Sequence, residues 1–213
     1  NSYKSIVPIV LLTILTSFLW QSCSAPRIQS NAQPVSHSIW DSLLRKHVDA
    51  NGLVDYKGMA ADSNQLNEYL QLLSLNAPNK KNWSDNEKMA YWINAYNAFT
   101  VDLILDYYPV KSIKDIKDPW DSKSLNLPNN TMTLNDIEHK VLRKMGDPRI
   151  HFAINCASAS CPQLSNEAFR ASKVQKQLEE ATALFINDTS KNEITEKNIG
   201  LSKIFLWFSK DFG

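Results

Sequence analysis

The chain has 213 residues, of which 43% are apolar and 21% are charged, and its 23 basic and 22 acidic residues leave a formal net charge of +1. This length suits a single domain with a substantial core, and the apolar content excludes a disordered chain. A net charge near zero provides no long-range attraction for nucleic acid, and three cysteines are too few for a disulfide-framework protein.

The first 23 residues are typical of an export signal. Residues 6–20 form an apolar run that is shorter than the roughly 20 residues needed to span a bilayer, but it has the length of a signal-peptide core. Ser22 and Cys23 follow this run and indicate a bacterial lipoprotein processing site, with Cys23 as the lipidated residue. We therefore expect an exported protein of the cell envelope, lipid-anchored at a membrane face. Secretion without a lipid and a membrane helix are the alternatives.

The remainder of the chain divides into a tether and one domain. Residues 24–38 are polar, contain proline and lack periodicity, so they are predicted to be a flexible tether with a solvated His37. Residues 39–213 then form the domain. Because the apolar segment 201–208 lies close to the end of the sequence, we expect the domain to be truncated at its C-terminus.

Helices dominate the first half of the predicted domain. Apolar spacing predicts helices over residues 39–48 and 63–74, with a short strand at 53–56 between them. Ser84 and Glu87 form a capping box, which opens a helix that continues to about residue 107.

The helix that begins after Ser84 is predicted to be the buried centre of the domain. Apolar residues cover most of its circumference, so it has no face suited to water. Asn94 and Asn97 lie side by side within it, and a buried amide without partners costs about 1 to 3 kcal/mol. These two side chains therefore either hold the backbone of neighbouring loops or belong to a binding site.

The second half mixes helices with short strands. Residues 111–130 form a connection long enough to cover part of the domain, and Thr133 opens a second capped helix. Residues 150–156 are predicted to be a buried strand, 172–186 an amphipathic helix and 193–201 a hairpin. The expected fold class is α+β: a helix-rich single domain around a long buried central helix, with a small antiparallel sheet.

Reactive side chains concentrate in residues 147–162. On a strand, His151 and Asn155 would share one face, while Cys156 would point into the core with its apolar neighbours. Cys161 lies in a loop of small residues that a partner can approach closely. A thiol near an imidazole is the minimum for a cysteine nucleophile, so Cys161 is the candidate nucleophile and His151 the candidate base.

A third group is needed to orient the histidine, and the sequence offers several. Glu138 is the leading candidate for this catalytic role, and Asp136, Asn94 and Asn97 are the others. Arg149 is interpreted either as a carboxylate-binding group in the cleft or as an ion-pair partner of Asp136 or Glu138.

The two nearby cysteines allow other readings. Export to an oxidising compartment would favour a Cys156–Cys161 disulfide, and both residues could also be free and inert. The four-residue gap between them does not fit the usual zinc spacing, and nothing resembles a nucleotide-binding motif. No metal and no cofactor are predicted.

Several motifs together resemble the bacterial branch of domain of unknown function family 547. The resembling segments are NGLVDY (51–56), YWINAYNA (91–98), LNDIEH (134–139), DPRIHFAINCA (147–157), SCP (160–162) and WFSKDF (207–212). Through a further resemblance to papain- and transglutaminase-like cysteine peptidases, this family implies a helix packed on a small antiparallel sheet. In that grouping the nucleophilic cysteine opens the central helix, whereas here the helix contains no cysteine and His151 precedes Cys161.

Two functions are consistent with these features. The first is a thiol-dependent acyl or amide hydrolase or transferase with Cys161, His151 and Glu138 as catalytic residues, and with Asn94, Asn97, Asn155 and Arg149 as binding residues. The second is a non-catalytic ligand- or protein-binding envelope domain with a structural disulfide. In both cases we expect an unknown small molecule or peptide as partner, a membrane contacted through the lipid anchor, and no nucleic acid.

Overall fold

A computed structural model describes residues 31–158 and 160–213 of the chain. The predicted export signal, Cys23 and residues 24–30 of the predicted tether lie outside the described residues. The α-helices and strands, in chain order, are α1 (Ser38–His47), α2 (Tyr56–Ala61), α3 (Ser63–Leu75), α4 (Asp85–Asp106), β1 (Ser124–Leu127), β2 (Asn130–Thr133), α5 (Leu134–Asp136), α6 (Val174–Ile186), β3 (Glu193–Ile194), β4 (Ile199–Gly200) and α7 (Ile204–Trp207). The prediction of a helix-rich α+β fold is confirmed.

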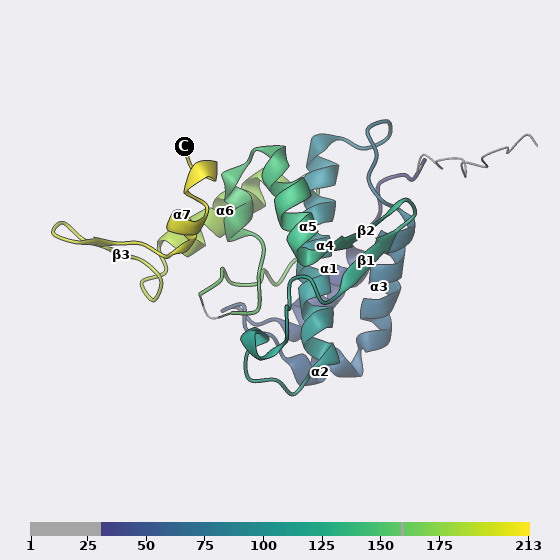
Figure 1. The fold of residues 1–213 in the computed structure, drawn as a ribbon, viewed down its shortest axis with the longest axis horizontal. Coiled ribbons are helices and arrows are strands. Elements are labelled where there is room, and N and C mark those ends of the chain that lie inside the picture. The colour runs from purple at the N-terminus through teal and green to yellow at the C-terminus, as the bar shows by residue number, and fades with distance from the viewer. Residues whose placement is uncertain (1–30, 159) are drawn as a thin grey trace, which may run out of the picture.

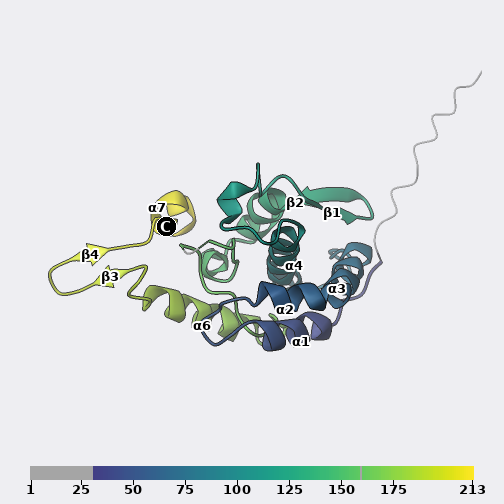
Figure 2. The same cartoon turned by 90° about the horizontal axis from the view of Figure 1, so that it is seen from below.

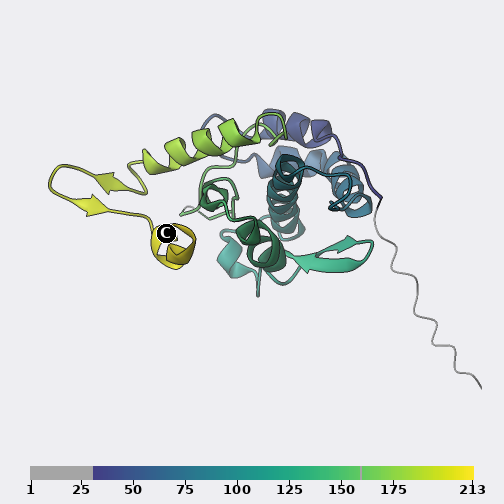
Figure 3. The same ribbon diagram turned by 90° about the horizontal axis from the view of Figure 1, so that it is seen from above.

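The helix α4 occupies the centre of the fold. Viewed along its axis, it lies between α1 and α6 on one side and α5 with the β1–β2 hairpin on the other, while α3 packs beside it (Figures 2 and 3). Both reciprocal hydrogen bonds of the Ser84–Glu87 capping box are present at its start. Residues on every side of α4 are buried, which confirms the prediction of a buried central helix.

Two antiparallel hairpins make up the strand content of the described residues. In β1–β2, Leu125 pairs with Met132, and these two side chains are buried while most of their strand neighbours face solvent. Most of this hairpin lies within the connection predicted over residues 111–130. The predicted hairpin at 193–201 is confirmed as β3–β4, which projects away from the body of the domain (Figure 1).

The segment 148–152 is helical, so the predicted strand over residues 150–156 is wrong. Asp147 accepts a hydrogen bond from the backbone N–H of Arg149 at 3.0 Å, and Pro148 occupies the first position of a 3₁₀ helix (Pro148–Phe152). An aspartate followed by proline is a helix-start signal, because proline has no N–H that needs a partner there. The alternation of faces inferred for a strand therefore does not hold, and His151 and Phe152 are both buried.

Part of the predicted tether is attached to the domain. The Nε1 atom of Trp83 and the Nδ2 atom of Asn79 both donate to the carbonyl oxygen of Ala32 at 2.9 Å. The Nδ1 atom of His37 lies 2.7 Å from the hydroxyl oxygen of Tyr69. His37 is therefore half-buried and hydrogen-bonded, which corrects the prediction that it is solvated.

The C-terminal segment packs through a small cluster of its own. Phe152, Phe185 and Ile204 are its buried members, and they lie apart from the main core around α4. Within the described residues, no helix has the length and the apolar character that would let it cross a bilayer.

Candidate functional site

A cavity of about 310 Å³ lies in the region between α5 and α7 (Figure 1). It is partly open to solvent and is lined by side chains from α4, from the loop before β1, from the helical segment that continues α5, from the loop after His151 and from the C-terminal segment. The lining residues are Tyr96, Trp120, Asp121, Asn135, Glu138, His139, His151, Ile154, Cys156, Cys161, Pro162, Ile204, Trp207 and Phe208. All three predicted catalytic residues are in this set, although 23 positions separate the first from the last.

The imidazole of His151 is held in one orientation. Its Nε2 atom lies 2.8 Å from Oδ2 of Asp211, and its ring stacks on Phe208 with 3.9 Å between the centroids. Burial lowers the pKa of His151 by more than the neighbouring carboxylate raises it, so the ring is neutral at pH 7. Since an ionised carboxylate only accepts hydrogen bonds, Nε2 carries the proton and Nδ1 is the basic nitrogen.

Asp211 is in turn fixed by Arg143. The guanidinium donates from Nε to Oδ2 at 2.6 Å and from Nη2 to Oδ1 at 2.8 Å, which is the two-bond geometry of a strong arginine–carboxylate pair. These hydrogen bonds hold the pKa of Asp211 far below its usual range. The third contact of Arg143 runs from Nη1 to Nδ1 of His139 at 3.1 Å. Because a guanidinium can only donate, that nitrogen of His139 carries no proton.

Asp211 was not among the predicted partners of His151. Sequence reasoning considered Glu138, Asp136 and two asparagines, all of which are closer in sequence. The available signal was a carboxylate within the aromatic motif at 207–212, just after the apolar segment 201–208. That motif provides the stacking ring of Phe208 as well as the carboxylate.

Glu138 lines the cavity but has a different partner. The hydroxyl of Tyr96 donates to its Oε2 at 3.3 Å, and burial raises the pKa of the Glu138 carboxyl. The nearby carboxylate of Asp211 adds to this increase. Glu138 is therefore hydrogen-bonded to Tyr96, while the orientation of His151 is set by Asp211.

Cys156 and Cys161 form a disulfide, with 6.0 Å between their Cα atoms. Both residues line the cavity, and Cys161 is the more buried of the two. The prediction that Cys156 points into the core is therefore wrong, since it depended on a strand that does not form. The bond leaves no thiol on Cys161, so the role of Cys161 as a nucleophile stays a prediction for the reduced protein.

The two asparagines of α4 hold loops against the helix. Asn94 exchanges hydrogen bonds with the backbone N–H and carbonyl of Phe169 at 2.9 and 2.8 Å. Asn97 accepts from the N–H of Asn155 at 2.8 Å and donates to the carbonyl of Ala153 at 3.0 Å. Both amides are buried and neither lines the cavity, as the loop-holding interpretation predicts.

The remaining predicted binding residues also lie outside the cavity lining. Asn155 braces the disulfide loop, donating from Nδ2 to the carbonyl of Pro162 at 2.7 Å. Arg149 binds Asp147 at 2.6 Å and Gln175 at 2.6 Å. Its predicted ion pair with Asp136 or Glu138 is thus wrong, because the carboxylate two residues before it in the chain is already within reach.

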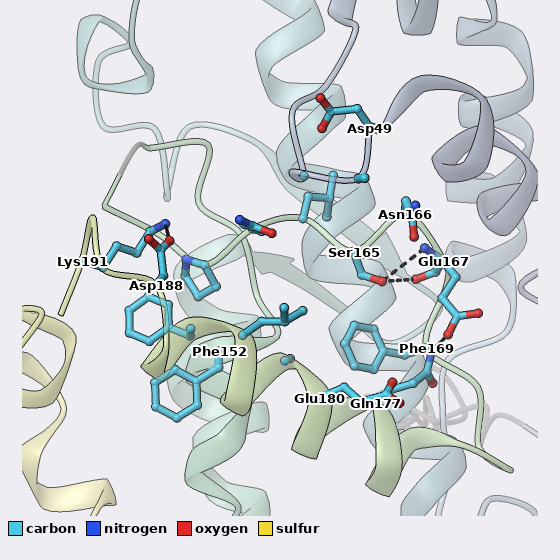
Figure 4. A pocket seen from close by; sticks show the side chains of 18 of the residues that line it. Asp49, Phe152, Ser165, Asn166, Glu167, Phe169, Gln177, Glu180, Asp188 and Lys191 are labelled. Carbon is cyan, nitrogen blue, oxygen red and sulfur yellow. Dashed lines mark hydrogen bonds and ion pairs between the residues drawn. The ribbon is translucent and has the colours of Figure 1, made fainter. Parts of the chain in front are cut away.

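A second cavity, of about 270 Å³, lies between α6, the turn at residues 49–52 and the loop at residues 162–169 (Figure 4). Its charged side chains are mostly paired with each other, as Arg45 is with Glu167 at 3.0 Å and Lys191 is with Asp188. None of the predicted catalytic residues lines it. The first cavity is therefore the candidate site.

Among the described residues, no group of three or more histidine, cysteine, aspartate or glutamate side chains is arranged to hold a metal ion. What the first cavity offers is instead a neutral imidazole on an ionised carboxylate, a carboxyl group with a raised pKa, and two sulfur atoms. These groups are the components of acid–base and thiol chemistry.

The fold and this set of groups define a helix-rich α+β domain with a partly open cavity that contains histidine and cysteine. A family model described as "Protein of unknown function, DUF547" matches residues 80–186, about half of the chain, and the chain belongs to that family. The match includes α4, Glu138, His151 and both cavity cysteines, and it ends before α7 and Asp211. No curated protein and no solved structure matches the chain, so the relation to papain-like peptidases stays a prediction.

Proposed function

We propose that the cavity performs thiol-dependent hydrolysis or transfer of an acyl or amide group when the Cys156–Cys161 disulfide is reduced. The observation that carries this proposal is that His151, Cys161 and Glu138 line one cavity, in which Asp211 orients the imidazole. An oriented, neutral imidazole beside a thiol is the arrangement required to form a thiolate nucleophile.

The proposed reaction begins with the reduced protein. The thiol of Cys161 gives its proton to Nδ1 of His151, and the sulfur attacks the carbonyl carbon of an ester or amide. Asp211 stabilises the imidazolium that results, because its carboxylate stays ionised. The imidazolium then protonates the leaving alcohol or amine. The acyl thioester on Cys161 is cleaved by water or by an acceptor amine, which regenerates the thiol.

The disulfide makes this activity dependent on a reductant. A dithiol would exchange with the Cys156–Cys161 bond, becoming oxidised itself and leaving two thiols in the protein. Until that exchange occurs, Cys161 cannot act as a nucleophile. Because Cys161 is buried and Cys156 is half-buried, we expect the reductant to attack at Cys156.

Single cysteine variants test the proposal. In Cys156→Ala, Cys161 is left as a free thiol, so we expect hydrolysis of a p-nitrophenyl ester without added dithiol. In Cys161→Ala, the remaining thiol belongs to the other residue, so we expect no hydrolysis with or without dithiol. The wild type should become active only after reduction. Equal rates in the two variants would contradict the assignment of Cys161.

The disulfide itself favours a second candidate function, a non-catalytic ligand- or peptide-binding domain. In this case the bond would brace the loop that closes the cavity, together with the hydrogen bond from Asn155 to Pro162. The five-residue separation gives the bond a stabilising effect of about 2 kcal/mol in the loop-entropy approximation. A protein that binds ligand in the oxidised state and hydrolyses no ester after reduction would fit this second function.

We further propose that the domain is exported and lipid-anchored through Cys23. The support is the sequence of the first 23 residues. Expression of the full chain in a bacterium with an alkyne-labelled fatty acid would test it. Incorporation of the label into the wild type but not into Cys23→Ser is the expected result, and equal labelling of both would contradict the proposal.

A further inference from the structure

The cavity between α5 and α7 carries negative charge without a balancing positive one. Asp121 and Glu138 contribute carboxyl groups, and the lining contains no lysine and no arginine. The nearest guanidinium, that of Arg143, is bound through two hydrogen bonds to Asp211. Arg143 lowers the pKa of Glu138 and so favours the ionised form of that carboxyl, but its hydrogen bonds to carboxylates are made to Asp211 and not to the cavity wall.

The two histidines in the lining do not supply positive charge either. His139 accepts a hydrogen bond from Arg143 at one ring nitrogen, which leaves that nitrogen without a proton. His151 is buried, and its pKa is lowered by that burial. A ligand in this cavity therefore meets one sign of charge.

Aromatic faces form much of the remaining wall. Tyr96, Trp120, Trp207 and Phe208 all line the cavity, and the face of an aromatic ring attracts cations. Phe208 is already covered by His151 and by the guanidinium of Arg143, whose carbon lies 5.3 Å from the ring centre. No cation from the described residues lies over Trp120 or Trp207, and Trp207 is 60% exposed at the rim.

Carboxyl groups, indole faces that carry no cation from the described residues, and the lack of lysine and arginine in the lining are complementary to an organic cation. We propose that this cavity binds a small molecule that carries a primary or quaternary ammonium group, and that it excludes carboxylates and phosphates. The ammonium group would face Asp121 and Glu138, with its carbon substituents against Trp120 and Trp207. This inference rests on the proposed function only in taking the same cavity as the site, and it identifies the substrate as an ester or amide that bears an ammonium group.

Probes matched in size and differing in charge provide the test. Benzylammonium, benzyltrimethylammonium, benzyl alcohol and benzoate would be titrated into the oxidised full chain, in which no thiol chemistry can occur. Binding would be measured by calorimetry and by saturation-transfer NMR. We expect the two cations to bind at least 10-fold more tightly than benzyl alcohol, and benzoate to show no saturable binding.

Two variants connect this selectivity to the cavity. Trp207→Leu removes an exposed indole and should weaken binding of benzyltrimethylammonium by roughly 2- to 30-fold, the range of a cation–π contact. Asp121→Asn removes an exposed carboxylate and should reduce the preference for cations over benzyl alcohol. Leu206→Ala is the matched control, because Leu206 is the neighbour of Trp207, is 72% exposed and does not line the cavity.

The results separate this inference from the proposed catalytic function. Binding of benzoate as tight as that of the cations, absence of saturable cation binding, or unchanged affinity in both Trp207→Leu and Asp121→Asn would overturn the inference. Cation-selective binding by a protein that hydrolyses no ester after reduction would support the inference and contradict the catalytic proposal. Ester hydrolysis without any charge preference in binding would support the catalytic proposal and contradict the inference.

Discussion

Replacing Asp211 by asparagine removes the charge that joins the C-terminal segment to the cavity. In the structure this carboxylate accepts two hydrogen bonds from Arg143 and one from His151, all between 2.6 and 2.8 Å. Its side chain is 20% exposed and that of Arg143 is 27% exposed, so water replaces these contacts only in part. The variant leaves a guanidinium without its counter-charge and an imidazole without its acceptor.

The expected loss of stability is larger than that of a surface ion pair. A hydrogen bond to a charged group contributes about 1.5 to 3 kcal/mol, and an asparagine oxygen can still accept one of the three. We therefore expect Asp211→Asn to lower the free energy of unfolding by about 2 to 4 kcal/mol at pH 7. For a chain of this size that corresponds to a decrease in Tm of roughly 4 to 16 °C.

The difference in free energy of unfolding between wild type and Asp211→Asn should depend on pH, through His151 near pH 6 and through Asp211 below about pH 4. Burial lowers the pKa of His151, so unfolding takes up a proton and stability falls as the pH decreases below about 6.5. Without Asp211 this pKa falls further, so the variant loses stability more steeply between pH 6.5 and 5. The pKa of Asp211 is itself lowered, so its contribution to stability in the wild type begins to be lost below about pH 4 and declines further as the pH falls.

Urea unfolding of both proteins at pH 7.5, 6, 5 and 3.5 would measure these differences. Asp121→Asn is the matched control. This exposed carboxylate lines the cavity and accepts a hydrogen bond only from Thr133 among the described residues, so we expect a change within about 0.5 kcal/mol. Equal stability of Asp211→Asn and wild type at pH 7.5, or parallel pH profiles, would refute the reasoning.

Three further substitutions test other parts of the fold. Asn97→Ala leaves two buried backbone groups without partners and should cost about 2 to 5 kcal/mol in urea unfolding, and a loss below 1 kcal/mol would contradict its loop-holding role. Gly52 has a φ of +73°, and an added Cβ would lie 2.6 Å from that of Gln163, so Gly52→Ala should lower the free energy of unfolding by about 1 to 3 kcal/mol. Burial lowers the pKa of His37 to about 4, so wild-type stability should fall between pH 6.5 and 4. His37→Gln can still form a hydrogen bond with Tyr69 and should flatten that decline. Identical pH profiles of stability for the two proteins would contradict this role of His37.

The helical framework could be predicted because its signals are local. The capping boxes at Ser84 and Thr133 each use residues three positions apart, so their hydrogen bonds need no distant partner. The apolar circumference of α4 indicated burial because no face of that helix suits water. The same kind of local signal is present at Asp147 and Pro148, which start a 3₁₀ helix where a strand over residues 150–156 was predicted.

The contacts that orient the cavity residues join segments far apart in the chain. His151 lies 60 residues from Asp211, and Arg143 lies 68 residues from it. By composition and spacing, Glu138 and Asp136 were equally good partners for the imidazole, and both are nearer in the chain. Which carboxylate reaches the ring depends on how α7 and the 3₁₀ turn that follows it (Ser209–Asp211) pack on Phe152 and Phe185.

The sequence by itself determined the positions of the main helices and the buried centre, because local hydrogen bonds and apolar periodicity specify them, and its motifs indicated the family. It also placed histidine, cysteine and glutamate among the reactive candidates. Only the tertiary structure decided that these groups share one cavity, that Asp211 orients His151, and that two cysteines are bonded. Such pairings form between segments far apart in the chain, and their energies arise only after the core has brought those segments together.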